Sequence, residues 1–340
     1  MRPLVAPAVR HSRSPRAPGC CRATAERPIL LTGLSVRRAH GFRHASPNDH
    51  QAWQDWVVRR GLALARPLPK VQLGVGSFTW PWAVGIRGYE PPKPLGARAL
   101  LAKAAALGVK VVQFCDNLPL EDLDENELHL VETRARALGI SVEVGTRGIE
   151  SARLLRNLRL AARFHSPILR TVTDRGKHEP TPEEVVRTVR PLMPAFARAG
   201  VRLAIENHDR FDSVTLAWIV ARLGTKFGGV CLDTVNSFGA LEGPQVVVER
   251  LARYTVNLHL KDFRIERVGS MLGFAVRGAP AGRGRLDVPW LLRELKSRKR
   301  DVNAIIELWT PWEGSIGETV EMEDKWAGES VRNMRQYIRE

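Results

Sequence analysis

From residue 71 onward, the chain alternates short apolar runs with longer segments whose apolar residues recur at helical spacing. Glycine, a common helix terminator, ends several of these segments, including ALLAKAAALG and ELHLVETRARALG. Eight strands separated by helices predict a closed (β/α)8 barrel, whose parallel strands are buried on both faces. No glycine-rich dinucleotide fingerprint follows the first run, which disfavours an open doubly wound sheet. The eight runs lie at residues 71–76, 109–114, 140–145, 168–172, 202–207, 229–233, 255–260 and 304–308.

The first 70 residues differ in composition from the rest of the chain. They contain 13 Lys and Arg against 3 Asp and Glu, whereas the remainder contains 39 against 33, so most of the net charge of +16 lies here. We expect residues 1–47 to form a basic, disordered extension, either a transit-like segment or upstream sequence included by a misplaced start codon. Residues 48–70 show helical spacing of apolar side chains and predict an N-terminal helix. Residues 71–340 then form the barrel domain.

The apolar runs and the cysteines limit the cellular context. No uninterrupted apolar stretch approaches the roughly 18 residues that a membrane helix needs, so no membrane partner is expected. The four cysteines give no disulfide framework, because Cys20 and Cys21 lie in the extension and Cys115 and Cys231 fall at separate runs. This usage favours a reducing compartment, and we expect a cytoplasmic protein. The oligomeric state is left open, with a homo-oligomer as one alternative.

Four residues with metal-ligand side chains stand at the ends of four consecutive runs. They are Glu206 after RLAI, Asp233 after GGVCL, His259 within TVNLHL, and Glu307 after NAII. An ionisable group is costly in a core but common at the carboxyl end of a barrel strand, where the active sites of such barrels lie. The gaps are 27, 26 and 48 residues, against about 30 residues for one unit of an eight-fold barrel. The spacing therefore predicts that the four side chains converge.

These side chains offer carboxylate oxygens and one imidazole nitrogen. Such a hard donor set suits Mn²⁺, Mg²⁺ or Co²⁺, while Zn²⁺ stays an alternative. A structural zinc site would instead prefer cysteine and histidine. Any one of the four residues alone would be explained as a strand-end ion pair or a core histidine. Four at successive strand ends favour a site for one divalent ion, with Mn²⁺ as the first choice.

The motifs LAIENHDRF, VCLDTVNSFG, NLHLKDF and AIIELW resemble those of the divalent-metal sugar isomerases and epimerases of the xylose-isomerase-like barrel superfamily, which include the ketose 3-epimerases. The resemblance extends over about residues 71–336. It implies that one divalent ion is held by Glu206, Asp233, His259 and Glu307. It also implies that Glu206 and Glu307 are the catalytic acid/base pair. The expected function is a metal-dependent isomerase or epimerase acting on a small polyhydroxylated carbonyl compound, such as a sugar, an inosose or a sugar acid.

The chemistry of that expectation follows from the donor set. A divalent ion would polarise a carbonyl and an adjacent hydroxyl group, acidify the C–H between them and hold the resulting enediolate. Epimerisation needs a carboxylate on each face of the substrate, whereas isomerisation needs one base and a proton relay. The ketose 3-epimerases carry a histidine three residues after the aspartate ligand, where Asn236 stands here. Asparagine hydrogen-bonds a substrate oxygen but does not donate a proton as imidazolium does, which argues against a relay there.

Two alternatives belong to other reaction classes. The segment GVGSFTWPWAVGIRGYEPPKPLG resembles the 3-oxo-isoapionate decarboxylase-like subgroup of the superfamily. This resemblance implies a metal-dependent decarboxylase or lyase of a 3-oxo sugar acid or 3-oxo-glycoside, with Lys261, Arg147 or Arg170 orienting the carboxylate. An apurinic endonuclease-like nuclease is the weaker alternative, because that family has a further histidine at the position of Asn236 and the barrel charge here is diffuse. No nucleic acid partner is therefore expected.

Seven further residues are expected to contact the substrate. Each follows a strand or shares its side of a strand with a predicted ligand, and amide and aromatic groups suit the hydroxyl groups and C–H faces of a sugar. The candidates are His208, Asn236, Lys261, Trp80, Gln113, Asn117 and Trp309.

Two segments near the C-terminus carry separate expectations. Residues 267–287 (RVGSMLGFAVRGAPAGRGRLD) predict a long loop after the seventh strand, serving as a lid or docking surface. Its expected hinges are Gly278, Gly282 and Gly284. The last segment predicts a helix that covers the barrel. Four charged residues are expected on its solvated face: Glu321, Glu323, Asp324 and Lys325.

Overall fold

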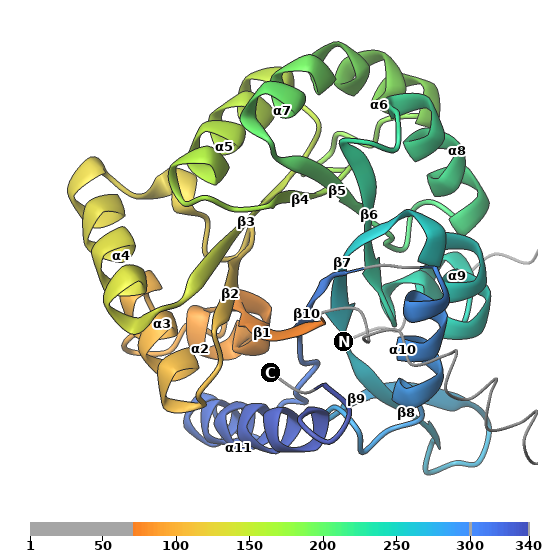
Figure 1. Cartoon of the computed structure of the whole chain (residues 1–340). Helices are drawn as coiled ribbons and strands as arrows, with labels where there is room; N and C mark the ends of the chain where they lie inside the picture. Colours follow the sequence, from red (N-terminus) through yellow and green to blue (C-terminus); the bar gives the residue numbers. More distant parts are fainter. Residues whose placement is uncertain (1–70, 299–300, 339–340) are drawn as a thin grey trace, which may run out of the picture. The chain divides into compact units, whose positions relative to one another are not determined.

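The computed structural model describes residues 71–298 and 301–338. Its strands form a closed parallel barrel surrounded by helices (Figure 1). The predicted (β/α)8 fold is therefore confirmed, while the predicted extension at residues 1–47 and helix at residues 48–70 lie outside the described residues. In order around the barrel, the strands are β1 (Gln72–Gly76), β10 (Asn303–Ile306), β7 (Thr255–Leu260), β6 (Gly228–Asp233), β5 (Arg202–Glu206), β4 (Ile168–Val172), β3 (Ser141–Arg147) and β2 (Val111–Phe114).

Helices connect the strands, and their ends follow local sequence signals. Thr181 caps α6, because its hydroxyl oxygen accepts a hydrogen bond from the backbone N–H of Glu184 at 3.2 Å, and Pro182 occupies the first turn. Gly139 ends α4 in the left-handed conformation, with φ of 62°. The helices are α2 (Pro81–Val84), α3 (Ala97–Ala106), α4 (Glu125–Leu138), α5 (Ser151–Arg163), α6 (Pro182–Val189), α7 (Met193–Ala199), α8 (Ser213–Leu223), α9 (Pro244–Leu251), α10 (Val288–Ser297) and α11 (Ile316–Met334).

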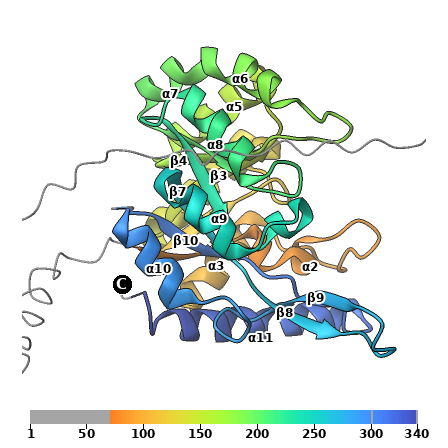
Figure 2. The same ribbon diagram turned by 90° about the vertical axis from the view of Figure 1, so that its right-hand side faces the viewer.

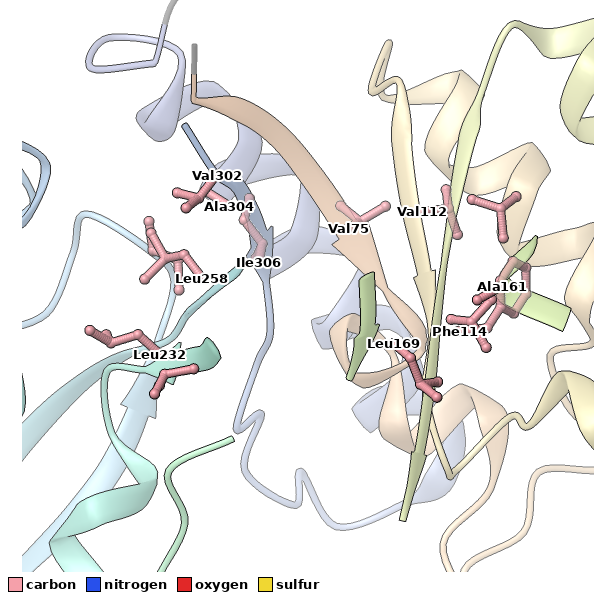
Figure 3. Close-up of a cluster of buried hydrophobic side chains, with 14 of the residues drawn as sticks. Val75, Val112, Phe114, Ala161, Leu169, Leu232, Leu258, Val302, Ala304 and Ile306 are labelled. Carbon is pink, nitrogen blue, oxygen red and sulfur yellow. The ribbon is translucent and has the colours of Figure 1, made fainter. Parts of the chain in front are cut away.

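Alternation along the strands produces two buried surfaces with different chemistry. One surface is apolar and packs against the helices, and Figure 3 shows part of it, including Val112, Phe114, Leu169, Leu232 and Leu258. The alternate strand positions face the barrel interior. Several of them are buried and polar: Gln113, Glu143, Arg170, Glu206, Asp233, Asn257 and His259. Because branched aliphatic side chains usually fill a barrel of this kind, the polar interior indicates a functional role.

Two glycines of β1 leave space inside the barrel. A Cβ atom on Gly74 would lie 2.5 Å from Cδ1 of Ile305, and one on Gly76 would lie 3.0 Å from the backbone oxygen of Gln113. The strand register places Gly74 beside Ile305 on β10 and Gly76 beside Gln113 on β2. Side chains of β2 and β10 can therefore occupy the volume that β1 leaves empty.

The segment after β7 is a hairpin, whereas the sequence predicted a long loop. β8 (Asp262–Arg267) and β9 (Phe274–Ala279) pair in antiparallel fashion and extend away from the barrel strands (Figure 2). A Cβ atom on Gly278 would lie 2.1 Å from the backbone oxygen of Trp309, and one on Gly284 would lie 2.1 Å from Oδ1 of Asp262. Close packing therefore explains these two glycines, and their role as hinges stays a prediction. Gly282, with φ of 82°, supports a turn.

Glu323 is buried, in contrast to the predicted solvated face of α11. Its two carboxylate oxygens accept hydrogen bonds from the backbone N–H groups of Trp82 at 2.8 Å and Ala83 at 2.9 Å. These N–H groups belong to the first turn of α2 and have no partner within that helix, which is why an acceptor is needed there. Burial raises the pKa of Glu323 to about 7, although both N–H groups oppose the rise. Asp324 stays exposed and pairs with Lys103.

Neither a membrane span nor a disulfide is found in the described part of the chain. No helix there is both long and apolar enough to cross a membrane. Cys115 and Cys231 are buried free thiols.

Replacing Glu323 should change how stability depends on pH. A carboxyl whose folded pKa lies near 7 stabilises the fold fully below its ordinary value of 4.5, and this contribution is lost as pH rises through 7. Glu323→Gln mimics the protonated form, so the stability advantage of the wild type should shrink by about 3 kcal/mol between about pH 5 and about pH 8. Thermal unfolding at both pH values measures this difference. Glu321→Gln, at an exposed position of the same helix, is the control. An equal advantage at both pH values would contradict the assignment.

Candidate functional site

A cavity of about 610 Å³ lies at the carboxyl ends of the barrel strands. Its lining comes from the ends of β3, β4 and β5 and from the segments that follow β1, β6, β7 and β10. Its charged and polar lining includes Arg147, Arg170, Glu206, Asn236, Lys261 and Glu307.

The four predicted ligand residues meet at this end of the barrel. Their strands, β5, β6, β7 and β10, are consecutive neighbours in the closed sheet. The Nδ1 atom of His259 lies 3.1 Å from Oε2 of Glu206 and 3.1 Å from Oε1 of Glu307. It lies 3.9 Å from Oδ2 of Asp233. All four side chains are buried, so the cluster is shielded from bulk water.

Backbone groups fix the orientation of Asp233. Its Oδ1 atom accepts hydrogen bonds from the N–H groups of Val235 at 2.8 Å and Asn236 at 2.7 Å. The strand register sets Asp233 directly opposite His259, after an irregularity at residues 230–231 that re-aims the end of β6. The second oxygen, Oδ2, is therefore the one that faces the cluster.

Arg170 is a buried cation beside the cluster. Its Nε atom donates a hydrogen bond to Oε2 of Glu206, and its Nη1 atom donates to Oδ1 of Asp116 at 2.7 Å. Nη1 also donates to the carbonyl oxygen of Thr146 at 3.2 Å. Within the described residues Nη2 has no hydrogen-bond partner, and Arg170 lines the cavity. The guanidinium therefore has donor capacity left for a ligand.

Lys261 is the second buried cation. Its Nζ atom lies 2.9 Å from Oδ2 of Asp233 and 2.9 Å from Oε2 of Glu307. It donates a further hydrogen bond to Oδ1 of Asn236 at 3.1 Å. Burial alone would lower the pKa of Lys261, but the neighbouring carboxylates, led by Asp233, raise it above its ordinary value. The ammonium group therefore stays charged and compensates two of the acids.

The buried charges shift the two central titrating groups. Burial alone would raise the pKa of Glu206, but Arg170 and His259 outweigh it and hold that pKa well below the usual range. Asn236 adds a hydrogen bond from Nδ2 to Oε1 of Glu206 at 2.8 Å. Burial lowers the pKa of His259, yet Glu307 and Glu206 raise it by more, so the net shift is upward. The cluster thus stabilises positive charge at its centre.

The donor atoms fit a divalent metal ion. Oδ2 of Asp233, Nδ1 of His259 and Oε1 of Glu307 are buried, and within the described residues no hydrogen bond of suitable geometry reaches them, although Nζ of Lys261 forms an ion pair with Oδ2 of Asp233 at 2.9 Å. Neighbouring ligand atoms of an octahedral ion with bonds of about 2.1 Å lie about 3.0 Å apart. This spacing is close to the 3.1 Å that separates the imidazole nitrogen from either glutamate oxygen. Three carboxylates and one imidazole suit a hard or borderline ion.

Four of the seven predicted substrate-contacting residues line the cavity. They are His208, Asn236, Lys261 and Trp309. The Nδ1 atom of His208 forms a hydrogen bond with Oδ1 of Asp209, and Trp309 is 41% exposed. An aromatic cluster of Trp82, Tyr89 and Trp312 extends this side of the cavity, with ring centroids 5.0 to 5.6 Å apart.

The other three predicted contacts lie away from the cavity lining. Trp80 is buried, and its indole N–H donates to Oδ1 of Asp324 at 2.8 Å. The amide of Asn117 donates to the backbone oxygen of Ser77 at 3.1 Å. Gln113 points into the barrel, because it alternates with the outward-facing Val112 and Phe114 on β2, and it reaches His259 from within.

Two polar residues of the site were missed in the sequence. Glu143 on β3 and Asn257 on β7 are buried inside the barrel and hydrogen-bonded to each other at 2.9 Å. Two signals in the sequence could have identified them. Glu143 is a charged residue in the middle of an apolar run, and Asn257 is a polar residue two positions before His259, on the same side of the strand. Burial raises the pKa of Glu143, opposed by hydrogen bonds from Asn303, Gln113 and Asn257.

Comparison with known proteins places this geometry in context. The chain is 34% identical over 259 residues to the 3-oxo-isoapionate decarboxylase of Pectobacterium atrosepticum, covering 76% of this chain and 93% of that protein. The D-psicose 3-epimerase of Clostridium cellulolyticum H10, solved with D-tagatose, shares the fold with a TM-score of 0.59 at 16% identity, over 79% of this chain and 99% of that chain. A xylose isomerase-like TIM barrel protein of Mycobacterium smegmatis, solved with magnesium, gives a TM-score of 0.57 at 13% identity. The match covers 79% of this chain and 98% of that chain.

The sequence also matches a family model directly. The model describes the xylose isomerase-like TIM barrel and aligns with residues 101–337, which include all four residues of the buried cluster. The chain therefore belongs to the xylose isomerase-like TIM-barrel family.

Proposed function

We propose that this protein is a metal-dependent decarboxylase acting on a 3-oxo sugar acid. The observation that carries the proposal is the 34% identity to a 3-oxo-isoapionate decarboxylase, which extends over 93% of that relative. The two buried cations in the cavity, Arg170 and Lys261, support it, because an acidic substrate needs compensation of its charge.

Glu206, Asp233, His259 and Glu307 would hold the ion. Their oxygen-rich donor set favours Mn²⁺ or Mg²⁺, with Co²⁺ and Zn²⁺ as alternatives. When bound, such an ion withdraws electrons from a substrate carbonyl and so favours loss of a neighbouring carboxylate.

Arg170 is the proposed anchor for the substrate carboxylate. Its Nη2 atom retains donor capacity at the cavity wall, and a guanidinium suits a planar carboxylate. Arg147 also lines the cavity and pairs with Asp174 at 2.6 Å, which holds it in place. Anchoring by Arg170 would orient the bond that breaks relative to the 3-oxo group.

The hydrogen bonds made by Glu206 support decarboxylation over abstraction of a proton from the substrate. Glu206 accepts hydrogen bonds from both Arg170 and Asn236, so both of its carboxylate oxygens are already engaged and less available to take a proton from a substrate. Decarboxylation needs no such base, because carbon dioxide leaves and its bonding electron pair passes to the 3-oxo group. The carbon that loses carbon dioxide must then gain one proton, and His208 at the cavity wall is the proposed donor.

A sugar isomerase or epimerase is the second candidate. Glu206 on β5 and Glu307 after β10 both line the cavity, which is the pair of carboxylates that the sequence predicted for proton transfer. The aromatic wall with Trp309 suits the C–H face of a polyhydroxylated substrate in either reaction.

Proton and carbon-13 NMR in deuterated water distinguish the two reactions. The Mn²⁺-treated protein is incubated with 3-oxo sugar acids labelled with ¹³C at the carboxyl, and with ketoses and inososes. We expect labelled carbon dioxide together with one deuterium on the carbon that lost it. Deuterium beside a carbonyl without loss of carbon would instead support the second candidate. If the protein binds Mn²⁺ but catalyses neither reaction, both candidate functions are contradicted.

Asp233→Asn should weaken binding of Mn²⁺ by at least about tenfold. The change removes a charge from the cluster while leaving an oxygen for the N–H groups of Val235 and Asn236. Isothermal titration calorimetry gives the affinity. Asp212→Asn is the control, because Asp212 caps α8 away from the cavity and asparagine also serves as an N-cap. Unchanged affinity in Asp233→Asn would sink the metal assignment.

A further inference from the structure

A chain of buried polar side chains crosses the barrel interior beneath the metal-ligand cluster. Gln113 on β2, Glu143 on β3 and Asn257 on β7 are each at most 1% exposed. Asn303, at the start of β10, completes the group. Buried polar groups are costly unless they are hydrogen-bonded, so the orientation of each amide in this group follows from its partners.

Glu143 fixes the orientation of the group. Its Oε2 atom accepts hydrogen bonds from Nε2 of Gln113 at 2.9 Å and from Nδ2 of Asn257 at 2.9 Å. Its Oε1 atom accepts from Nδ2 of Asn303 at 2.7 Å. A carboxylate only accepts hydrogen bonds, so each neighbouring amide must turn its NH₂ group toward Glu143.

The orientation of Gln113 then determines what it offers to His259. With its NH₂ group held by Glu143, its carbonyl oxygen faces the opposite way and lies 2.6 Å from Nε2 of His259. Because a carbonyl oxygen cannot donate, Nε2 of His259 must carry the hydrogen. In the neutral ring Nδ1 then has the free electron pair, and this is the atom 3.1 Å from the oxygens of Glu206 and Glu307.

We propose that Glu143 and Gln113 are positioning residues that set the tautomer of His259, so that Nδ1 presents its electron pair to the metal ion. This inference rests on the metal site assigned under the proposed function. Gly76 lies beside this arrangement on β1, and a Cβ atom there would lie 3.0 Å from the backbone oxygen of Gln113, so the glycine allows β1 and β2 to pack closely where Gln113 begins.

Glu143→Gln is the primary test, since Glu143 has no contact with the cavity. Glutamine has one acceptor oxygen where three NH₂ groups now converge, so the amide of Gln113 loses its charged acceptor. It keeps two neutral partners, Oδ1 of Asn257 at 3.0 Å from its Nε2 and the thiol of Cys115 at 3.1 Å from its Oε1, and with these weaker contacts it can turn its NH₂ group toward His259. That rotation would place the hydrogen of the neutral ring on Nδ1. We expect the affinity for Mn²⁺ to fall by about 10- to 100-fold, measured by calorimetry.

The exchange variant Gln113→Glu with Glu143→Gln supplies the rescue. In this variant the carboxylate at position 113 accepts the hydrogen bond from Nε2 of His259. The amide at position 143 donates its NH₂ group to that carboxylate, so the two positions have exchanged their donor and acceptor roles. We expect the affinity for Mn²⁺ to return to within about tenfold of the wild type. Glu323→Gln is the matched control, because it also alters a buried carboxylate that accepts N–H groups and should reduce the melting temperature without changing the affinity.

Nitrogen NMR of histidine-labelled, metal-free protein reads the tautomer itself, at a pH high enough to neutralise the ring. His259→Asn identifies the resonance. The wild type should carry the hydrogen on Nε2, and Glu143→Gln should shift it to Nδ1 or give a mixture. Wild-type tautomer and affinity in folded Glu143→Gln would overturn the inference. If the wild type bound no divalent ion, the proposed metal site would fail, and the NMR result would still decide the tautomer.

Discussion

Three carboxylates lie within a few ångströms of one another inside a closed barrel, and the rest of the structure must compensate their charge. Glu206, Asp233 and Glu307 are all buried, and each contacts Arg170 or Lys261. Like charges so close in a low dielectric would be strongly destabilising without such partners. Arg170 and Lys261 therefore do two things at once, because they stabilise the folded barrel and leave cationic groups at the wall of the cavity.

The polar side chains that lie below the carboxylates inside the barrel also need partners. His259 connects the acids to the amides below, and its ring contacts Glu206 on one side and Gln113 on the other. A network of this kind is favourable only when all its members find partners. Beside the network, the side chain of Ile305 occupies the space that Gly74 of β1 leaves, since its Cδ1 atom lies 2.5 Å from where a Cβ atom would stand.

Much of the fold follows from the sequence because alternation and spacing are local signals. The predicted run at residues 255–260 coincides with β7, and a regular gap of about one βα unit brings Asp233 opposite His259. The contact between Gln113 and His259 was not predictable, since it spans the closed ring and depends on which strands become neighbours. The burial of Glu323 depends likewise on α2, more than 200 residues earlier in the chain. The pairing of β8 with β9 is not predictable from the sequence, because the polar and glycine residues of this segment are typical of a loop.

The order of charged residues along the chain has a consequence for synthesis. Arg170 precedes Glu206, its partner, and Lys261 precedes Glu307. Domains are made from the N-terminus onward, so a nascent chain already contains the compensating cation when each of these glutamates is added. The strand that precedes Glu307, β10, is the last strand of the barrel to be made. Both cations are therefore already present when Glu307 is added, and its charge is compensated as soon as β10 completes the ring.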